Sequence, residues 1–304
     1  MTEEIASRQK VRTVNVEARA PSVSSKSSLS SKLAVNETTT QRWSFLEDVT
    51  AYFEAGFGAI GVWLPKLVQF GEERGIELIR DSGMSVSSVS WAGGFTGWNG
   101  QSFQDSVDDA LEAVKTAGEL NAESLVVISG ARCGHTLSHA RQLLVDALKI
   151  LADDAGEYGL SLALQPMYSR EWSFLTSLDD TLEIIEKCNH PLVKMALDVS
   201  QLWKEPHLLE RIPEIASLVT TLQLCDRRDP PRCEFDQLLP GDGEIPLEEI
   251  TKAFLDADYD GFFEIKIWSE ELWNSDYSEL LRTCRSRLES LCLSGSADGS
   301  MVSC

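Results

Sequence analysis

The chain has 304 residues, and 48 acidic against 27 basic side chains give it a formal net charge of −21. Such a surface repels phosphate backbones and anionic lipids, which argues against nucleic acids and membrane surfaces as partners. The length suits one (β/α)₈ barrel of about 250 residues. A hydrophobic content of 43% with 25% charged residues is ordinary for a globular domain with a large core.

The cysteines and the two ends of the chain narrow the class of protein further. Seven cysteines, with no CxxC pair among them, argue against a disulfide framework and favour a reducing, cytoplasmic location. No apolar run approaches the ~20 residues that a membrane span needs. Residues 1–32 are polar and Ser-rich, so we expect a disordered arm. Residues 294–304 indicate a flexible tail, which leaves one domain over 33–293.

Between these ends, short apolar runs of strand length recur in a regular order. The eight runs are Leu33–Asn36, Ala59–Trp63, Val86–Trp91, Leu125–Ile128, Leu162–Gln165, Met195–Asp198, Thr221–Cys225 and Phe262–Ile267. Helical stretches separate them, with apolar residues three and four positions apart, as in 103–114, 140–151 and 277–288. Eight such units predict a parallel sheet that closes into a (β/α)₈ (TIM) barrel.

A doubly wound open sheet is the rival fold. It requires a Gly-rich phosphate-binding turn after the first strand. Residues 37–40 read ETTT and offer no glycine there. We therefore predict the barrel.

Active sites of such barrels lie at the carboxyl ends of the strands. Because side chains alternate along a strand, Gln165 shares a face with Ala163 and Asp198 shares one with Ala196. On the last strand Glu264 and Lys266 share a face with Phe262, and on the seventh Gln223 does so with Thr221. The opposite faces are apolar, so the polar sides are predicted to point into the barrel.

Six segments follow one another in the order of a known family. They are ETTTQRWSF (37–45), AIGVWLPKL (59–67), LALQPMYSR (162–170), ALDVSQLW (196–203), PGDGEIPLEEI (240–250) and EIKIWSEELW (264–273). Through them the chain resembles the sugar phosphate isomerase/epimerase proteins, which are xylose-isomerase-like barrels. That resemblance implies a Mn²⁺ or Mg²⁺ ion at the barrel mouth that polarises a hydroxy-ketone while two glutamates shuttle a proton.

When the family's metal-ligand positions are matched to this sequence residue by residue, most of them hold a different residue type. The Glu that ends strand five corresponds to Gln165, and the Asp that ends strand six is kept as Asp198. The strand-seven His corresponds to Gln223, and the strand-eight Glu to Lys266. In the alternative alignment Glu264, one layer deeper, is the fourth ligand.

A further family residue, the substrate-binding His three positions after the Asp, corresponds to Gln201. Two amides and an ammonium cannot supply the charge that a hard divalent cation wants. We therefore expect no metal cofactor and a Lys266–Asp198 ion pair in its place. The pair either fills a vacated site or holds a substrate oxygen through the ammonium.

Loops at the expected mouth supply other candidates. His135 and Arg132 follow strand four, as a catalytic and an anion-binding candidate respectively. Lys66, after strand two, and Arg170, after strand five, are predicted to reach a substrate carboxylate or phosphate. Tryptophans at strand ends predict an aromatic-lined pocket for a sugar face; they are Trp63, Trp91, Trp98, Trp172, Trp203 and Trp268.

Three hypotheses for function remain open at this point. The first is a metal-independent sugar isomerase or epimerase acting on a polyhydroxylated or carbonyl-containing small molecule, with Lys266 and Asp198 in catalysis and Gln165 and Gln223 orienting the substrate. The second is a non-catalytic barrel that only binds such a molecule. The third is a lyase or aldolase in which Lys266 forms an imine with a carbonyl. The oligomeric state stays open, with a homo-oligomer possible.

Overall fold

The apolar runs form a closed barrel of parallel strands in the computed structural model, which describes residues 29–97 and 100–294. Its strands are β1 (Leu33–Asn36), β2 (Ala59–Trp63), β3 (Ser85–Gly93), β4 (Ser124–Ile128), β5 (Ser161–Leu164), β6 (Val193–Asp198), β7 (Val219–Leu224) and β10 (Phe262–Ile265). They pair in the order β1-β10-β7-β6-β5-β4-β3-β2, so the last strand closes on the first. The predicted (β/α)₈ fold is confirmed, and the predicted strands lie within two residues of the observed bounds.

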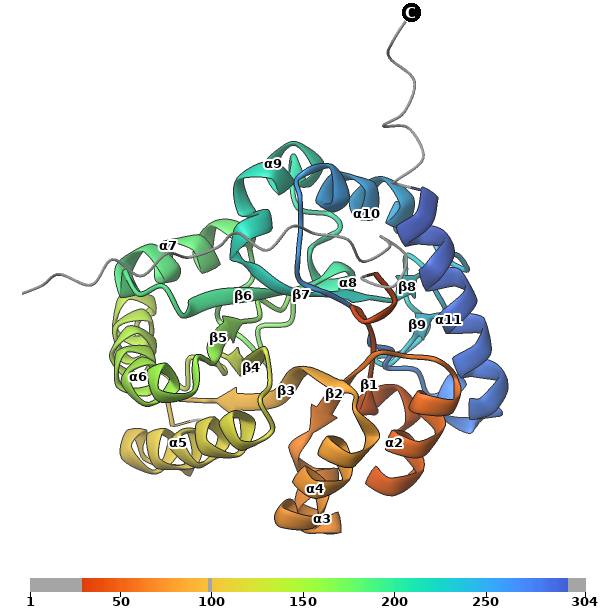
Figure 1. Ribbon diagram of the computed structural model, residues 1–304. Coiled ribbons are helices and arrows are strands. Elements are labelled where there is room, and N and C mark those ends of the chain that lie inside the picture. The colour runs from red at the N-terminus through yellow and green to blue at the C-terminus, as the bar shows by residue number, and fades with distance from the viewer. Residues whose placement is uncertain (1–28, 98–99, 295–304) are drawn as a thin grey trace, which may run out of the picture.

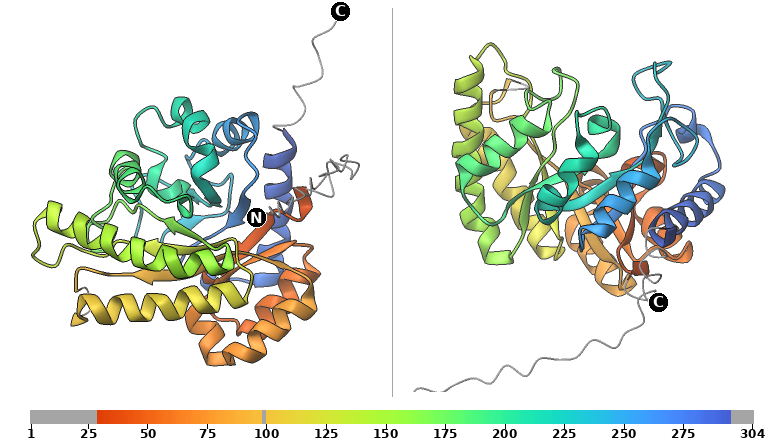
Figure 2. Two further views of the ribbon diagram at one scale, coloured as in Figure 1. Left: turned by 60° about the vertical axis from the view of Figure 1, so that its left-hand side comes forward. Right: turned by 90° about the horizontal axis from the view of Figure 1, so that it is seen from above.

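Helices surround the barrel and cover its outer face (Figures 1 and 2). They are α2 (Phe45–Glu54), α3 (Leu64–Phe70), α4 (Glu72–Ser82), α5 (Phe103–Glu119), α6 (Leu137–Tyr158), α7 (Leu178–Cys188), α8 (Val199–Leu202), α9 (Leu208–Ile215), α10 (Leu247–Asp256) and α11 (Tyr277–Ser294). Local chemistry fixes several starts: the Ser44 and Ser102 side chains form capping boxes with Glu47 and Asp105.

One element was not expected from the alternation. The segment between β7 and α10 forms a small antiparallel hairpin of β8 (Asp226–Arg227) and β9 (Gln237–Leu238). Asp236 also forms an antiparallel bridge with Ser269, just after β10. The hairpin therefore lies against the carboxyl end of the last barrel strand.

The barrel interior holds two small apolar clusters. Ala34, Ala59 and Phe262 form the one near the amino ends of the strands. Val126, Ala163 and Ala196 form the other, and Trp91 packs against it. The main core lies between the strands and the helices, where the outward strand residues are buried. Small residues inside leave room for the polar side chains described below.

The chain ends lie largely outside the described residues. The predicted arm and tail over 1–28 and 295–304 stay predictions for that reason. Residues 29–32, which we expected in the arm, pack on the barrel: Leu29 lies against the core, and Lys32 Nζ donates to Asp260 O at 2.7 Å. The ordered domain thus begins before Leu33.

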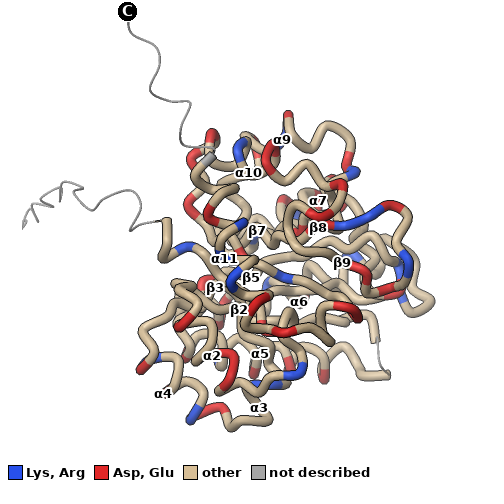
Figure 3. The backbone as a smooth tube through the Cα atoms, turned by 90° about the vertical axis from the view of Figure 1, so that its right-hand side faces the viewer, with Lys and Arg blue, Asp and Glu red and all other residues tan. Residues whose placement is uncertain are grey.

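Charged residues are spread over the outer helices, and several basic residues lie along the segment that contains β8 (Figure 3). Within the described residues no helix is long and apolar enough to cross a membrane. The six cysteines of that part of the chain are all free.

Candidate functional site

An ion pair lies at the carboxyl ends of β6 and β10, inside the barrel. Lys266 Nζ is 3.1 Å from Asp198 Oδ2 and donates to Gln223 Oε1 at 3.0 Å. Gln165 Nε2 donates to the same Asp198 oxygen at 3.3 Å. All four residues are almost fully buried, with exposed fractions of 5% or less. The structure thus brings together the four residues that strand alternation placed on the inner face.

The hydrogen-bond directions in this group are fixed by chemistry. An ammonium only donates, so the Gln223 oxygen must face Lys266 and its nitrogen must point elsewhere. That nitrogen donates to Glu264 Oε1 at 3.1 Å. An ionised carboxylate only accepts, so Gln165 presents its nitrogen to Asp198. Within the described residues no donor lies within bonding distance of Gln165 Oε1, which leaves this oxygen available to a ligand.

Asp198 caps the amino end of the short helix α8, which directly follows β6. Ser200 donates to Asp198 Oδ1 twice, from its backbone N at 2.9 Å and from its Oγ at 2.7 Å. Gln201 Nε2 reaches Ser200 Oγ at 3.3 Å, and Gln201 Oε1 accepts from Tyr168 N at 3.1 Å. Gln201 therefore links the loops after β5 and β6, beside the ion pair rather than in it.

Glu264 lies one layer deeper, as its position in the strand predicts, and is fully buried. Asn36 and Gln223 donate to its Oε1, and Ser87 and Ser88 donate to its Oε2. Burial raises the pKa of this carboxyl, while the two serine hydroxyls act in the opposite direction. Strands β1, β3 and β7 thus all converge on one carboxylate of β10.

A glycine on β2 leaves the space that this carboxylate needs. A Cβ at Gly61 would lie 2.5 Å from Glu264 Oε2 and 2.5 Å from Asn36 Nδ2. Any larger residue at this strand position would displace the buried carboxylate. The predicted strand contains this glycine, but the need for a residue without a side chain at this position becomes clear only when β2 lies beside Glu264 in the barrel.

Two tryptophans cover the ion pair. Lys266 Nζ lies 5.3 Å from the centre of the Trp268 ring, a cation–π distance. Trp91 and Trp268 lie 5.9 Å apart at an interplanar angle of 35°. Trp268 also makes a T-shaped contact with Phe235, in the loop between β8 and β9. These two of the predicted tryptophans form an aromatic wall beside the ammonium.

Lys66 is placed otherwise than we expected. Its ammonium is buried and bonds Asp48 Oδ2 at 2.5 Å, Glu37 O at 3.1 Å and Thr40 O at 3.0 Å. Three acceptors use all three of its N–H groups. Lys66 therefore connects the turn after β1 to α2 and α3, and none of its N–H groups remains to donate to a substrate anion.

Glu37 lies in the same cluster without a donor for one oxygen. Its Oε2 accepts from Trp63 N at 2.8 Å, while its buried Oε1 accepts no hydrogen bond. Burial, and then the neighbouring Asp48 carboxylate, raise the pKa of Glu37 well above its usual range. Burial raises the pKa of Asp48 as well, but less, because the Lys66 charge and the hydrogen bonds from Lys66 and the Thr40 hydroxyl lower it. Since the pKa rises more at Glu37 than at Asp48, we expect a proton shared by the pair to reside on Glu37.

A Glu37→Gln variant tests this assignment. Since the folded pKa exceeds the unfolded one, wild-type stability falls as pH rises above about 4.3 and through the folded pKa. The amide mimics the neutral acid, so the variant lacks this fall. Urea unfolding between pH 5 and 8 should show the wild type losing up to about 1.4 kcal/mol per pH unit relative to the variant. A stability difference that does not change over this range would contradict the assignment.

The remaining predicted residues lie outside the ion-pair group. His135 packs on His139 in a T-shaped arrangement with 4.7 Å between ring centres, and no described contact joins it to Asp198 or Lys266. Arg132 and Arg170 are exposed on the loops after β4 and β5.

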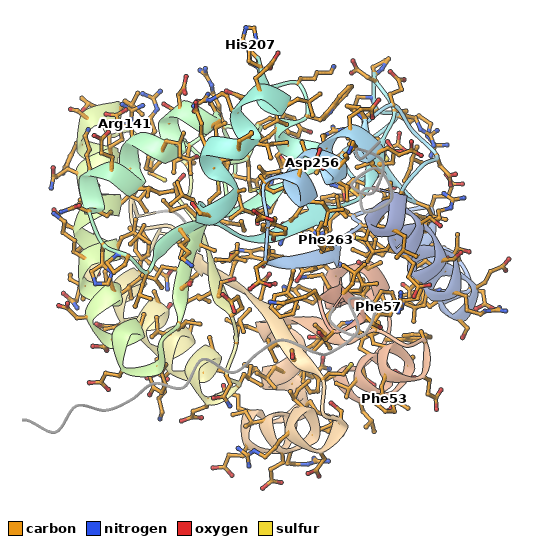
Figure 4. The ribbon with its side chains drawn as sticks, turned by 45° about the horizontal axis from the view of Figure 1, so that its top comes forward. Phe53, Phe57, Arg141, His207, Asp256 and Phe263 are labelled. Carbon is orange, nitrogen blue, oxygen red and sulfur yellow. The ribbon has the colours of Figure 1, made fainter. Side chains whose placement is uncertain are left out.

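Of the other tryptophans, Trp63 borders a separate hollow of about 530 Å³ with Arg42 and Phe70. Trp203 packs on the core, with Lys204 over its ring. Trp98 lies outside the described residues. His207, at the start of α9, projects from the periphery of the molecule (Figure 4). The wall beside the ion pair is thus built by Trp91 and Trp268.

Comparison with protein families gives a match over residues 49–287 to the family described as "Xylose isomerase-like TIM barrel". The chain belongs to this family. The match spans all the barrel strands except β1.

The fructoselysine 3-epimerase of Shigella flexneri is 21% identical to this chain over 168 residues. That alignment covers 54% of this chain and 59% of the epimerase, so the chain matches little more than half of the curated relative's length.

Solved structures support the same fold. The protein SMc04130 from Sinorhizobium meliloti 1021 superposes with a TM-score of 0.80 at 26% identity, over 86% of this chain and 98% of that one. The IOLI protein, solved with a zinc atom, gives a TM-score of 0.78 at 17% identity, over 86% and 98%. The sequence resemblance to a family of xylose-isomerase-like barrels is therefore confirmed at the level of family and fold.

Proposed function

We propose that this chain is a metal-independent enzyme of the sugar isomerase or epimerase type. Its substrate would be a polyhydroxylated or carbonyl-containing small molecule. The observation that carries the proposal is the Lys266 ammonium, fixed at the barrel mouth by Asp198 and Gln223. Two of its three N–H groups are used, so one remains for a ligand oxygen.

The donor set supports the absence of a metal. Lys266 lies within 3.1 Å of the Asp198 oxygen that a cation would need. Gln165 and Gln223 turn their nitrogens toward carboxylates, and these nitrogens are not ligands for a hard cation. No group of three His, Cys, Asp or Glu side chains in the described part of the chain is arranged to hold an ion. These residues do not fit the family's metal.

In the proposed reaction the third Lys266 N–H bonds the carbonyl oxygen of the substrate. A fixed positive charge there stabilises the negative charge that develops as a proton leaves the neighbouring carbon. Asp198, the carboxylate at the same level, receives that proton, and Gln165 Oε1 accepts a substrate hydroxyl. The Trp91 and Trp268 rings offer an apolar wall for the face of a sugar.

A purely binding role is the second candidate, favoured by one observation. Asp198 already accepts four hydrogen bonds, from Ser200 twice, from Gln165 and from Lys266. A carboxylate so fully bonded is a poor base unless the ligand displaces a donor. The imine hypothesis is weaker, because it requires a neutral amine and the Asp198 carboxylate at 3.1 Å favours the ammonium.

Deuterium exchange distinguishes these roles. Purified protein is first treated with EDTA to remove metal ions, and elemental analysis verifies their removal. It is then incubated in D₂O with ketoses such as D-fructose and D-tagatose. The proposal expects exchange at the carbon beside the carbonyl, unchanged by EDTA and absent in the Lys266→Met plus Asp198→Asn variant. Saturable binding without exchange indicates the binding role, and exchange that returns only with added Mn²⁺ overturns metal independence.

A further inference from the structure

We propose that Gln237, on the hairpin outside the barrel, is a positioning residue that fixes the Asp198–Lys266 pair. Its side chain is 8% exposed, and neither alternation nor the family resemblance points to it. The functional role of Gln237 rests on the proposed function of the Asp198–Lys266 pair, whereas the hydrogen bonds that position the pair do not depend on that function.

The Gln237 amide has only one possible orientation. Trp268 N donates to its Oε1 at 2.7 Å, and a backbone N–H requires an acceptor, so the oxygen faces Trp268. The amide nitrogen then faces Ser200 Oγ, to which it donates at 2.9 Å. Gln237 N also donates to Trp268 O at 3.0 Å, which anchors the residue to the end of β10.

This orientation determines the direction of the Ser200 hydroxyl. Its oxygen accepts from Gln237 Nε2 and from Gln201 Nε2, so both lone pairs are used. Its proton points to Asp198 Oδ1 at 2.7 Å, a charged oxygen and a stronger acceptor than the Cys225 thiol that also hydrogen-bonds with Ser200. The hairpin amide thereby holds the hydroxyl in the rotamer that binds Asp198.

The contacts close into a ring. From Lys266 they pass to Asp198, Ser200, Gln237 and Trp268, and the backbone returns from Trp268 to Lys266 two residues earlier. Trp268 is also the residue whose ring lies over the ammonium. One hairpin side chain therefore fixes both the counter-ion and the aromatic cover of Lys266, as the supporting shell of a precise site must.

Two variants separate the two ends of the amide. Gln237→Met removes both hydrogen bonds. Gln237→Glu keeps an acceptor for Trp268 N but offers Ser200 an acceptor in place of a donor, which draws the hydroxyl away from Asp198. The matched control is Arg232→Met, which loosens the hairpin by removing its bonds to Asp236 and Glu271 and touches no member of the ring.

The readout is hydrogen exchange of the Lys266 ammonium in ¹⁵N-labelled protein, assigned by the loss of its signal in Lys266→Met. We expect exchange about tenfold faster in both Gln237 variants, the size of one lost hydrogen bond of about 1.4 kcal/mol, and unchanged in Arg232→Met. The Trp268 amide should lose protection in Gln237→Met and keep it in Gln237→Glu. All variants are compared at equal temperature below their melting points.

Two outcomes overturn the proposal. Exchange that stays at the wild-type rate in Gln237→Glu shows that the amide does not orient Ser200. An equal acceleration in Arg232→Met shows that the stability of the hairpin, and not the amide, holds the pair. Neither outcome depends on turnover, so a failure of the proposed reaction in the ketose experiment leaves this test intact.

Discussion

Lys266→Met alone is expected to cost about 3–5 kcal/mol of folding free energy, since it leaves the Asp198 charge buried without its partner. The pair is nearly excluded from solvent, with side-chain exposures of 6% and 3%. Urea or thermal unfolding measures the loss. The control is Lys252→Met, which breaks an exposed pair with Asp256 on α10 and should change stability by less than about 0.5 kcal/mol.

The double change Lys266→Met plus Asp198→Asn separates stability from function. It removes both charges of the pair, so the cost of a buried Asp198 carboxylate without a partner disappears and we expect most of the stability lost in Lys266→Met to return. It also removes the ammonium that we propose holds the substrate oxygen, so ketose binding and deuterium exchange should disappear. A folded double variant that still catalyses exchange at the wild-type rate would show that the pair carries none of the chemistry.

Lys66→Met is expected to be as damaging, for a different reason. The change leaves the fully buried Asp48 carboxylate without its counter-ion, and it leaves the backbone carbonyls of Glu37 and Thr40 without a hydrogen-bond donor. We expect a loss of about 3–5 kcal/mol with no change in ketose affinity at temperatures where the variant is folded.

The matched control for this prediction is Lys115→Met. Lys115 is exposed and lies 4.0 Å from Glu119 on α5, so its loss should cost less than about 0.5 kcal/mol. A Lys66→Met protein as stable as this control would contradict the structural role. Weakened ketose binding in a stable protein would instead return Lys66 to the substrate-binding candidates.

The barrel could be predicted because strand periodicity is a local property. Alternation of side chains placed Glu264 and Lys266 on one inner face, and eight repeats of strand and helix determined the closure. The same rule found Gln165, Asp198 and Gln223, since each inner face ends at the mouth. Local pattern was sufficient wherever the backbone alone decides the direction of a side chain.

The rest of the site depends on contacts between distant segments. Lys66 was expected at the mouth because it follows a strand, but Asp48, 18 residues earlier, holds it in the outer layer. Gln237 lies in an irregular insert with no periodicity to assign its face. The available signal is the hairpin pattern itself, two short segments on either side of the two prolines at 230–231.

The position of β10 in the chain has a consequence for biosynthesis. The donors that surround Glu264 come from β1, β3 and β7, all of which leave the ribosome before β10 does. Until residue 264 is made, the interior of the nascent barrel contains amides and hydroxyls with no carboxylate to receive them. An unpaired polar interior is costly to bury, so the partial chain cannot settle into a dry, closed form. Completion of the last strand supplies the edge that closes the barrel, the central acceptor and the Lys266 ammonium, so we expect the closed fold and the proposed site to form together, after residue 266 has left the ribosome.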